Sequence, residues 1–261
     1  MISKFFDEVI VLSLRSDDTL IVEKQIAVKK QLDSLGIPFT MWEGFNATKI
    51  SNPSFAQLTL PPNALSNGER KKMRKGELGC LLSWISVLQY AKSKKIKGFL
   101  ALEDDVILSK DFIERMKMLD EECPEDAGVI FLGGNTYTLN IPKKSRLKEH
   151  IWELSKSYKH FGTFCHIVTE KAYDDLLDAH YKMEDIVDVI TVKECKYGKV
   201  KGYMMLPYCG YNPVNYSGIA GKVVNNYSNL LYSETPTLES CPAVNERWEI
   251  NRKGVWPKCL I

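Results

Sequence analysis

The sequence of 261 residues predicts an α/β domain in which helices flank a mostly parallel central sheet. Three observations carry this prediction. The chain opens with an apolar run, a helical pattern and a second apolar run, the order of a strand–helix–strand unit. Its main apolar runs are continuous rather than alternating, as in strands that are buried on both faces. The length is sufficient for one large domain with a substantial core.

The first unit is bounded by recognisable signals. Residues 9–14 read VIVLSL and predict a buried strand. Asp18 offers helix-capping chemistry, and apolar residues at helical spacing follow from 21 to 35. Gly36 predicts the end of this helix, and residues 39–42 predict a short second strand.

The same alternation continues through the middle of the chain. Strands are predicted at residues 98–102, 128–132, 164–168 and 200–208, and helices at residues 76–90, 109–121, 169–177 and 184–192. Residues 43–67 form a long irregular segment, which is either a lid or binding wall, or a disordered insertion. The segment from residue 210 onward is predicted to be irregular. We therefore expect one domain over residues 1–222, with residues 223–261 as an irregular extension packed on it.

Three consecutive acids, Glu103, Asp104 and Asp105, end the predicted strand at residues 98–102. Unpaired carboxylates cost several kcal/mol each when buried, so they must lie at the rim of the sheet, where α/β proteins bind ligands. In an extended segment Glu103 and Asp105 would point to one side and Asp104 to the other. The triplet alone leaves two interpretations open: a divalent-metal site, or an acidic turn that caps the following helix.

Two familiar classes of acidic site do not match the triplet. A haloacid-dehalogenase-type phosphatase needs an Asp nucleophile two residues before a second Asp, and here the run is Glu-Asp-Asp-Val. A receiver domain needs an acid pair after its first strand and a much shorter chain. A nucleotide-sugar transferase fits better, because its carboxylates hold Mn²⁺ or Mg²⁺ against the donor's diphosphate, and hard oxygen ligands suit these ions.

Several segments, in this order, carry a family resemblance. Arg15 follows the first strand, residues 76–83 read GELGCLLS, and residues 102–106 read LEDDV. Residues 165–172, 186–188 and 217–219 then read CHIVTEKA, IVD and SGI. Over residues 8–222 the chain resembles glycosyltransferase family 25, which includes lipopolysaccharide galactosyltransferases and procollagen galactosyltransferase domains.

The resemblance implies a GT-A fold and the inverting transfer of a hexose from a UDP-sugar, most often UDP-galactose, to a glycan, glycolipid or glycoprotein acceptor. It implies a Mn²⁺ or Mg²⁺ ion held by Asp105 and Glu103. Donor-binding positions carried over from the family are Ser13, Leu14, Arg15, Ser83, Glu103 and Asp104.

An inverting transfer also needs a general base for the acceptor hydroxyl. Asp188 matches the family's acid, and its apolar neighbours favour partial burial and a raised pKa; the alternative is an ordinary aspartate on the surface of a helix. Asp185 is the second candidate, predicted three residues away on the same helical face, and Glu184 is a reserve. His166 is either a ligand or base, or a hydrogen-bonded structural histidine, and His160 is similar.

Two departures from the family pattern favour a rival function. Trp84 stands where the family usually has His, and residues 17–19 lack the family's second arginine. The alternative is therefore a weak or inactive member that acts as a sugar-nucleotide or glycan-binding module. A structural interaction protein is a third possibility.

Composition points to no macromolecular partner. The formal net charge is only +2, which gives no reason to expect nucleic acid. The basic run at residues 70–75 is either solvated surface or a peripheral contact with phosphates or anionic lipid. Seven scattered cysteines favour a reducing compartment, although Cys241 and Cys259 form a candidate pair. No signal peptide or transmembrane run is evident, so we expect a soluble, cytoplasmic protein.

Overall fold

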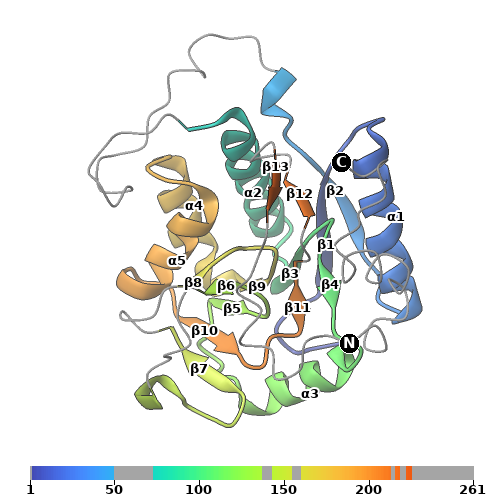
Figure 1. The fold of residues 1–261 in the computed structure, drawn as a ribbon. Helices are drawn as coiled ribbons and strands as arrows, with labels where there is room; N and C mark the ends of the chain where they lie inside the picture. Colours follow the sequence, from blue (N-terminus) through green and yellow to red (C-terminus); the bar gives the residue numbers. More distant parts are fainter. Residues whose placement is uncertain are drawn as a thin grey trace.

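The computed structural model describes residues 2–49, 73–136, 143–154, 160–212, 215–217 and 222–224. Its centre is a seven-stranded sheet with the strand order β2-β1-β3-β9-β5-β10-β7, covered by helices on both faces (Figure 1). The strands of this sheet are β1 (Glu8–Leu14), β2 (Thr40–Gly44), β3 (Gly98–Glu103), β5 (Val129–Phe131), β7 (Ile151–Glu153), β9 (Cys165–Thr169) and β10 (Gly202–Met205).

The sheet is mixed but mostly parallel. Strand β1 pairs in parallel with β2 and β3, and β10 pairs in parallel with β5. Strand β9 runs antiparallel between β3 and β5, and β7 runs antiparallel to β10. Strands β2, β1, β3, β5 and β10 therefore run one way, and β9 and β7 run the other. This confirms the predicted α/β fold class, and the arrangement is consistent with the GT-A fold that the resemblance implies.

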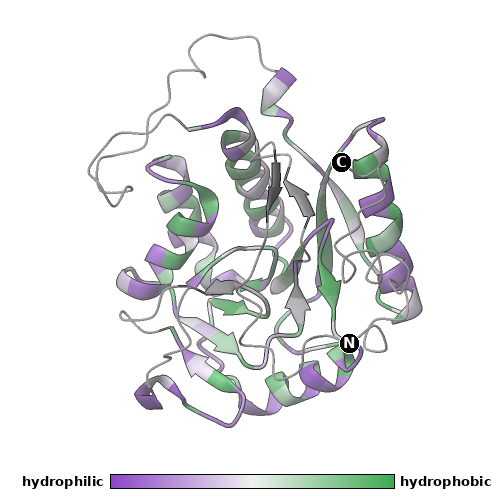
Figure 2. Ribbon diagram, in the orientation of Figure 1, coloured by the Kyte–Doolittle hydropathy of each residue, from purple (hydrophilic) through white to green (hydrophobic). Residues whose placement is uncertain are grey.

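The helices form the two outer layers. They are α1 (Thr19–Ser34), α2 (Lys75–Ser93), α3 (Phe112–Glu122), α4 (Tyr173–Tyr181) and α5 (Val187–Tyr197). Helices α1 and α3 contribute to one hydrophobic core, and α2, α4 and α5 contribute to the other. Figure 2 shows the corresponding pattern, with hydrophobic strands at the centre and helices that are hydrophilic on their outer sides.

Successive side chains along each strand point alternately into the two hydrophobic cores. In β1, Ile10 and Leu12 pack with α2, while Val9 and Val11 pack with α1. In β3, Phe99 and Ala101 lie on the α2 face, while Leu100 and Leu102 lie on the α1 face. Because both faces are covered, the strands show the continuous apolar runs seen in the sequence. The same alternation determines to which face the side chains at the strand ends point.

Local signals place most predicted elements where expected. Asp18 caps α1, accepting a hydrogen bond from the Leu20 amide at 2.9 Å, and Gly36 follows the helix with φ of +65°. The helix predicted over residues 184–192 instead begins at Val187, so Asp185 precedes it. The expectation that Asp185 and Asp188 share a helical face is therefore wrong.

Three short strands lie where the sequence predicts only irregular chain. They are β11 (Gly210–Tyr211), β12 (Asn215–Ser217) and β13 (Lys222–Val224). Strand β11 pairs antiparallel with β4 (Ile107–Leu108), which brings the chain after β10 against the segment that follows β3. This pairing is not local, which explains why a scan of sequence windows misses it.

Other expectations fall outside the described residues. These include most of the long loop, the start of the basic run at residues 70–72, the Cys241–Cys259 pair and nearly all of the extension at residues 223–261. The division into domain and extension stays a prediction. No helix in the described part of the chain combines the length and apolar character needed to cross a membrane.

Candidate functional site

The candidate site lies where two parallel neighbours end. Strands β1 and β3 pair so that Leu12 lies opposite Glu103. Ser13 and Leu14 therefore reach the same edge of the sheet as the three acids. In open α/β sheets this carboxyl edge is where ligands bind.

The three acids divide between the two faces of the sheet. Glu103 ends β3 in line with Phe99 and Ala101, on the face that α2 and α5 cover. The chain then turns, with the Val106 amide donating to the Glu103 carbonyl at 3.2 Å. The extended geometry expected for residues 103–105 is therefore wrong, because the strand stops at Glu103.

On the α1 side, Ser13 connects the two strand ends. Its Oγ donates a hydrogen bond to Oδ2 of Asp104 at 2.5 Å. Nε2 of Gln25, from the second turn of α1, donates to Ser13 Oγ and to the Leu14 carbonyl, each at 2.9 Å. The helix, the first strand and the acidic turn are thus joined by one hydrogen-bonded network.

Asp105 is held by two partners from distant parts of the chain. Nζ of Lys24, the neighbour of Gln25, lies 3.1 Å from Asp105 Oδ2, and both side chains are only 12% exposed. Nδ2 of Asn212 donates to Asp105 Oδ1 at 3.0 Å. Neither partner was predicted, because a lysine in a charged helix resembles solvated surface and Asn212 lies beyond the last predicted strand.

On the opposite face, Glu103 interacts electrostatically with Asp188, which lies in the first turn of α5. Burial, followed by the charges of Asp105, Asp104 and Asp188, raises the pKa of Glu103 to about 8. After burial, the charges of Glu103 and Asp188 both raise the pKa of the Cys80 thiol on α2. Glu103, Asp188 and Cys80, from three different elements, therefore interact electrostatically.

Asp188 is fixed by main-chain donors. Its Oδ2 accepts from the Gly162 amide at 3.3 Å, and its Oδ1 accepts from the Val189 amide at 2.9 Å. Burial raises the pKa of Asp188. The backbone donors lower this pKa and the charge of Asp185 raises it, and the net direction is upward. A carboxylate held in this way is suited to accepting a proton.

Asp185 makes different contacts from those of Asp188. It is 3% exposed, and its Oδ2 lies 2.8 Å from Nζ of Lys193 on α5. Its Oδ1 accepts from the Ile186 amide at 2.9 Å. This ion pair attaches the segment before α5 to the helix itself. The reserve candidate, Glu184, is exposed.

Ser83 links α2 to the chain that leaves β2. It is 2% exposed, and its Oγ donates to the Gly79 carbonyl and accepts from the Phe45 amide, each at 2.6 Å. A Cβ atom on Gly79 would lie 2.4 Å from the Phe45 carbonyl oxygen. The GELGC motif thus permits close packing beside the site. Arg15 is exposed directly after β1.

The aromatic candidates are part of the core. Trp84 is 2% exposed, and its ring centroid lies 5.3 Å from that of His166. Burial lowers the pKa of His166 to about 4, so it is neutral near pH 7. Trp42 packs against Tyr90 with ring centroids 4.8 Å apart. These contacts favour the structural interpretation of His166.

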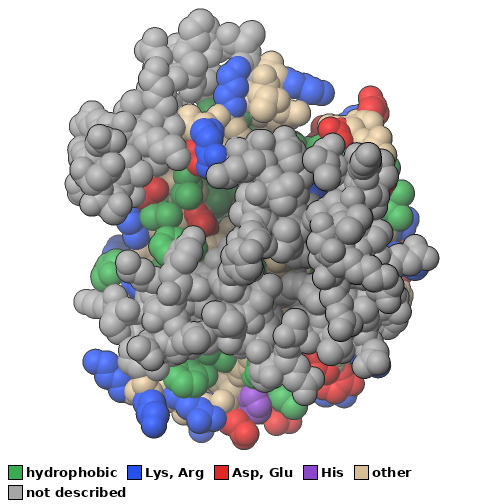
Figure 3. Space-filling model, viewed as in Figure 1, with side chains coloured by type: hydrophobic (Ala, Val, Ile, Leu, Met, Phe, Trp, Pro, Cys, Tyr) green, Lys and Arg blue, Asp and Glu red, His purple; other side chains and the backbone are tan. Residues whose placement is uncertain are grey.

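Two basic clusters lie on the surface, apart from the Lys24–Asp105 pair. Of the run at residues 70–75, Arg74 caps α2 through an ion pair with Glu77 at 2.5 Å. Figure 3 shows further Lys and Arg side chains at the lower left of the face in view. Exposed basic residues before β7 are Lys143, Lys144, Arg146 and Lys148. Solvated surface is the common interpretation of such clusters, and the peripheral contact of residues 70–75 stays a prediction.

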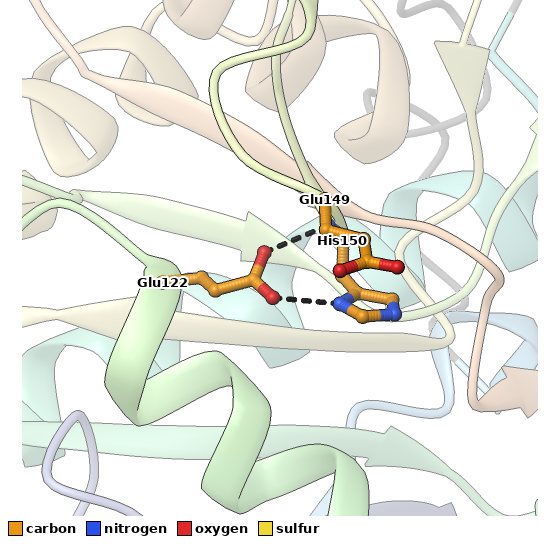
Figure 4. Close-up of side chains that lie close together, drawn as sticks. All are labelled: Glu122, Glu149 and His150. Atoms are coloured by element: carbon orange, nitrogen blue, oxygen red, sulfur yellow. Dashed lines mark hydrogen bonds and ion pairs between the residues drawn. The ribbon is translucent and has the colours of Figure 1, made fainter.

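The ligand chemistry of the acidic turn fits a hard divalent cation, since Glu103, Asp104 and Asp105 offer only oxygen. Among the described residues, however, the one set of three His, Cys or carboxylate ligand atoms within 4.8 Å of one another is Glu122, Glu149 and His150. Figure 4 shows His150 bonded to Glu122 through both its backbone amide and its ring, each at 2.7 Å. That cluster ties the end of α3 to the start of β7.

Comparisons with known proteins agree with the resemblance. The family model "Glycosyltransferase family 25 (LPS biosynthesis protein)" matches residues 6–191. The chain is 26% identical over 196 residues to the procollagen lysyl hydroxylase and glycosyltransferase of Acanthamoeba polyphaga mimivirus, covering 72% of this chain and 21% of that protein. The chain thus spans about a fifth of that relative's length. It is also similar to a glycosyltransferase involved in glycosylation of the major capsid of PBCV-1, with 12% identity, 66% of each chain covered and a TM-score of 0.35.

Proposed function

The chain belongs to glycosyltransferase family 25, and on this basis we propose that it is a metal-dependent, inverting hexosyltransferase that uses a UDP-sugar. UDP-galactose is the first donor to test, and the acceptor is a glycan, glycolipid or glycoprotein. The observation that carries the proposal is the hydrogen bond from Ser13 to Asp104, which joins the acidic turn after β3 to the end of β1 at the carboxyl edge of the sheet.

The donor half of the site would use the ends of β1 and β3. Asp105 and Glu103 would hold Mn²⁺ or Mg²⁺, which neutralises charge on the leaving diphosphate when it is bound. Ser13, Leu14 and Arg15 would contact the nucleotide, and Asp104 would be kept in place by Ser13. Ser83 would hold α2 against the chain that leaves β2, because its hydroxyl bonds to Gly79 and Phe45.

The acceptor half would use Asp188. In an inverting transfer the acceptor oxygen attacks the anomeric carbon as the bond to the diphosphate breaks, and the hydroxyl proton passes to the base. Backbone bonds from Gly162 and Val189 orient the Asp188 carboxylate, and its raised pKa favours proton uptake. Asp185 would support this geometry through its ion pair with Lys193.

The names of the family model and of the relative suggest two acceptor classes to test. The matching family model is described as an LPS biosynthesis protein, which suggests a glycolipid. The mimiviral relative is named for procollagen lysyl hydroxylase and glycosyltransferase, which suggests a hydroxylysine-containing peptide. An acceptor panel should therefore contain both classes.

The position of Trp84 bears on the rival function, a binding module without turnover. Trp84 packs in the core against His166, so its substitution alters the packing between α2 and β9. The acids Glu103, Asp105 and Asp188 are present as an enzyme requires, and turnover of a UDP-sugar is the property that separates an enzyme from a binding module.

A thermal-shift screen of nucleotide sugars, with Mn²⁺ and with a chelator, tests the proposal. We expect uridine nucleotides to raise the melting temperature in Mn²⁺ and to have little effect in the chelator. UDP release from UDP-galactose, measured next, separates an enzyme from a binding module. If no uridine nucleotide stabilises the protein under either condition, the proposal is wrong.

A further inference from the structure

Asp105, the residue expected to ligate the metal, already contacts a cation supplied by the chain. The Lys24 ammonium lies 3.1 Å from Oδ2, while Oδ1 accepts a hydrogen bond from Asn212. Both members of the Lys24–Asp105 pair are 12% exposed, so the pair is shielded from solvent more than a surface ion pair is. A divalent ion that binds Oδ2 would therefore compete with this ammonium.

Electrostatics makes the two cations competitors. Like charges a few ångströms apart in a partly buried site repel strongly, because the effective dielectric constant there is far below that of water. The Lys24 charge also acts on Glu103, whose pKa it lowers against the larger raising effects of burial and the neighbouring acids. Lys24 is therefore coupled electrostatically to both of the expected metal ligands.

The surroundings of Lys24 allow its head group to move while its backbone stays in place. Its neighbour Gln25 is bonded to Ser13 and to Leu14, which attaches this turn of α1 to β1. A lysine stem has four flexible carbons and carries three rotatable donors. The ammonium can thus change partners without any movement of the helix.

We propose that Lys24 fills the cation position on Asp105 in the nucleotide-free protein, leaves Oδ2 when a divalent ion binds, and then binds the diphosphate of the donor. The inference rests on the proposed function, because it assumes a metal and a nucleotide diphosphate at this edge. It assigns Lys24 two successive partners, Asp105 and then phosphate. The site therefore keeps a positive charge beside Asp105 in both states.

A purely structural ion pair would behave differently. If the Lys24–Asp105 pair were only structural, replacing Lys24 would lower stability and would weaken both metal binding and nucleotide binding. If Lys24 instead competes with the metal and later binds phosphate, removing its charge has two effects of opposite sign. Without nucleotide, the variant binds Mn²⁺ more tightly than the wild type. At saturating Mn²⁺, the variant binds UDP more weakly.

The test compares Lys24→Met, Lys24→Gln and Lys24→Arg with the wild type. Lys24→Gln keeps a hydrogen-bond donor without the charge, which protects the comparison if Lys24→Met folds poorly. Lys24→Arg keeps the charge, so its affinities for Mn²⁺ and for UDP should stay close to those of the wild type. Lys92→Met is the matched control, because Lys92 pairs with Asp174 on an exposed surface.

Mn²⁺ affinity is measured first, by electron paramagnetic resonance without nucleotide, and UDP affinity is then measured by calorimetry at saturating Mn²⁺. For Lys24→Met and Lys24→Gln we expect Mn²⁺ to bind about tenfold more tightly and UDP about tenfold more weakly, a typical size for coupling between sites. Mn²⁺ binding by the variants alone, with none by the wild type, would also support the proposal.

Unchanged or weaker Mn²⁺ binding by both neutral variants, or Mn²⁺ binding by no form of the protein, would overturn it. So would unchanged UDP affinity. These failures are distinguishable from failure of the proposed function, which would appear as a wild-type protein that no uridine nucleotide stabilises.

Discussion

Ser13 Oγ lies 2.5 Å from Oδ2 of Asp104, and this hydrogen bond joins the end of β1 to the turn after β3. The two residues are far apart in sequence, but their strands are parallel neighbours in the sheet. The contact holds Asp104 on the α1 side, while Glu103 lies on the side of α2 and α5. The acidic triplet is thus divided between two halves of the site.

Ser13→Ala removes this bond. We expect the free energy of unfolding to fall by about 1–2 kcal/mol, because Asp104 loses a donor to a half-buried carboxylate. UDP binding should weaken as well, since the acidic turn loses its connection to β1. Urea denaturation and calorimetry measure the two effects. Ser34→Ala is the control, because Ser34 bonds only locally, to the Gln31 carbonyl. Equal UDP affinity in Ser13→Ala and wild type would contradict the proposed role of Ser13.

Asp188→Asn tests whether Asp188, rather than Asp185, is the general base. The amide can keep the bond from Gly162 but cannot accept the proton, so we expect kcat to fall by about 10²–10⁴-fold. UDP affinity should be unchanged. Stability should fall by about 1–2 kcal/mol, because the amide nitrogen cannot accept the bond from Val189.

Asp185→Asn is the matched variant. It weakens the pair with Lys193, so we expect a loss of about 1–3 kcal/mol in stability, with activity per folded molecule largely retained. The opposite result, in which Asp185→Asn abolishes kcat and Asp188→Asn does not, would reverse the two assignments.

Buried histidines make the fold sensitive to acid. Burial lowers the pKa of His160 to about 3 and those of His166 and His180 to about 4. Since the unfolded chain has a histidine pKa of about 6.5, it takes up protons first as the pH falls. The stabilising contribution is therefore complete above pH 6.5 and is lost as the pH falls toward 4.

Urea denaturation at pH 7.5 and pH 5 measures this loss, which we expect to reach about 2 kcal/mol per histidine. Glu103, with its raised pKa, acts in the opposite direction between about pH 4.5 and 8, so the comparison needs a variant. His180→Gln can keep the donor to Thr191 and should flatten the pH dependence. The same slope in wild type and variant would contradict this assignment.

Gly79→Ala tests the close packing of α2 beside the site. The added Cβ would lie 2.4 Å from the Phe45 carbonyl, so we expect a cost of about 1–3 kcal/mol and weaker UDP binding. Gly36→Ala is the control, because its positive φ costs about 1–2 kcal/mol with open space around the site of the added atom. If both variants bind UDP equally well, the α2 packing does not position the site.

The sequence was sufficient for the fold class and for the strand ends that build the site. Local patterns determined these features: the VIVLSL run, the Asp18 cap and the three acids after an apolar strand. Six strands of the central sheet follow from such patterns, because strands buried on both faces have a recognisable composition. Strand β7 and the antiparallel direction of β9 were not predicted.

The sequence did not reveal how the acids divide between faces or which residues pair with them. Lys24 and Asn212 lie far from Asp105 along the chain, and no local signal marks either. The start of α5 at Val187 separates Asp185 from Asp188, although a helical window groups them. These features depend on tertiary contacts, which periodicity does not encode.

The most direct test of the account is calorimetric titration of UDP into the wild type and Asp105→Asn, with Mn²⁺ and with a chelator. The amide nearly matches the carboxylate in shape and can still accept from Lys24, so we expect the variant to fold. The account predicts that the wild type binds UDP in Mn²⁺ and loses most of that affinity in the chelator, and that Asp105→Asn binds weakly in both. Equal, Mn²⁺-dependent binding of UDP by both proteins would contradict the assignment of Asp105 as the metal ligand.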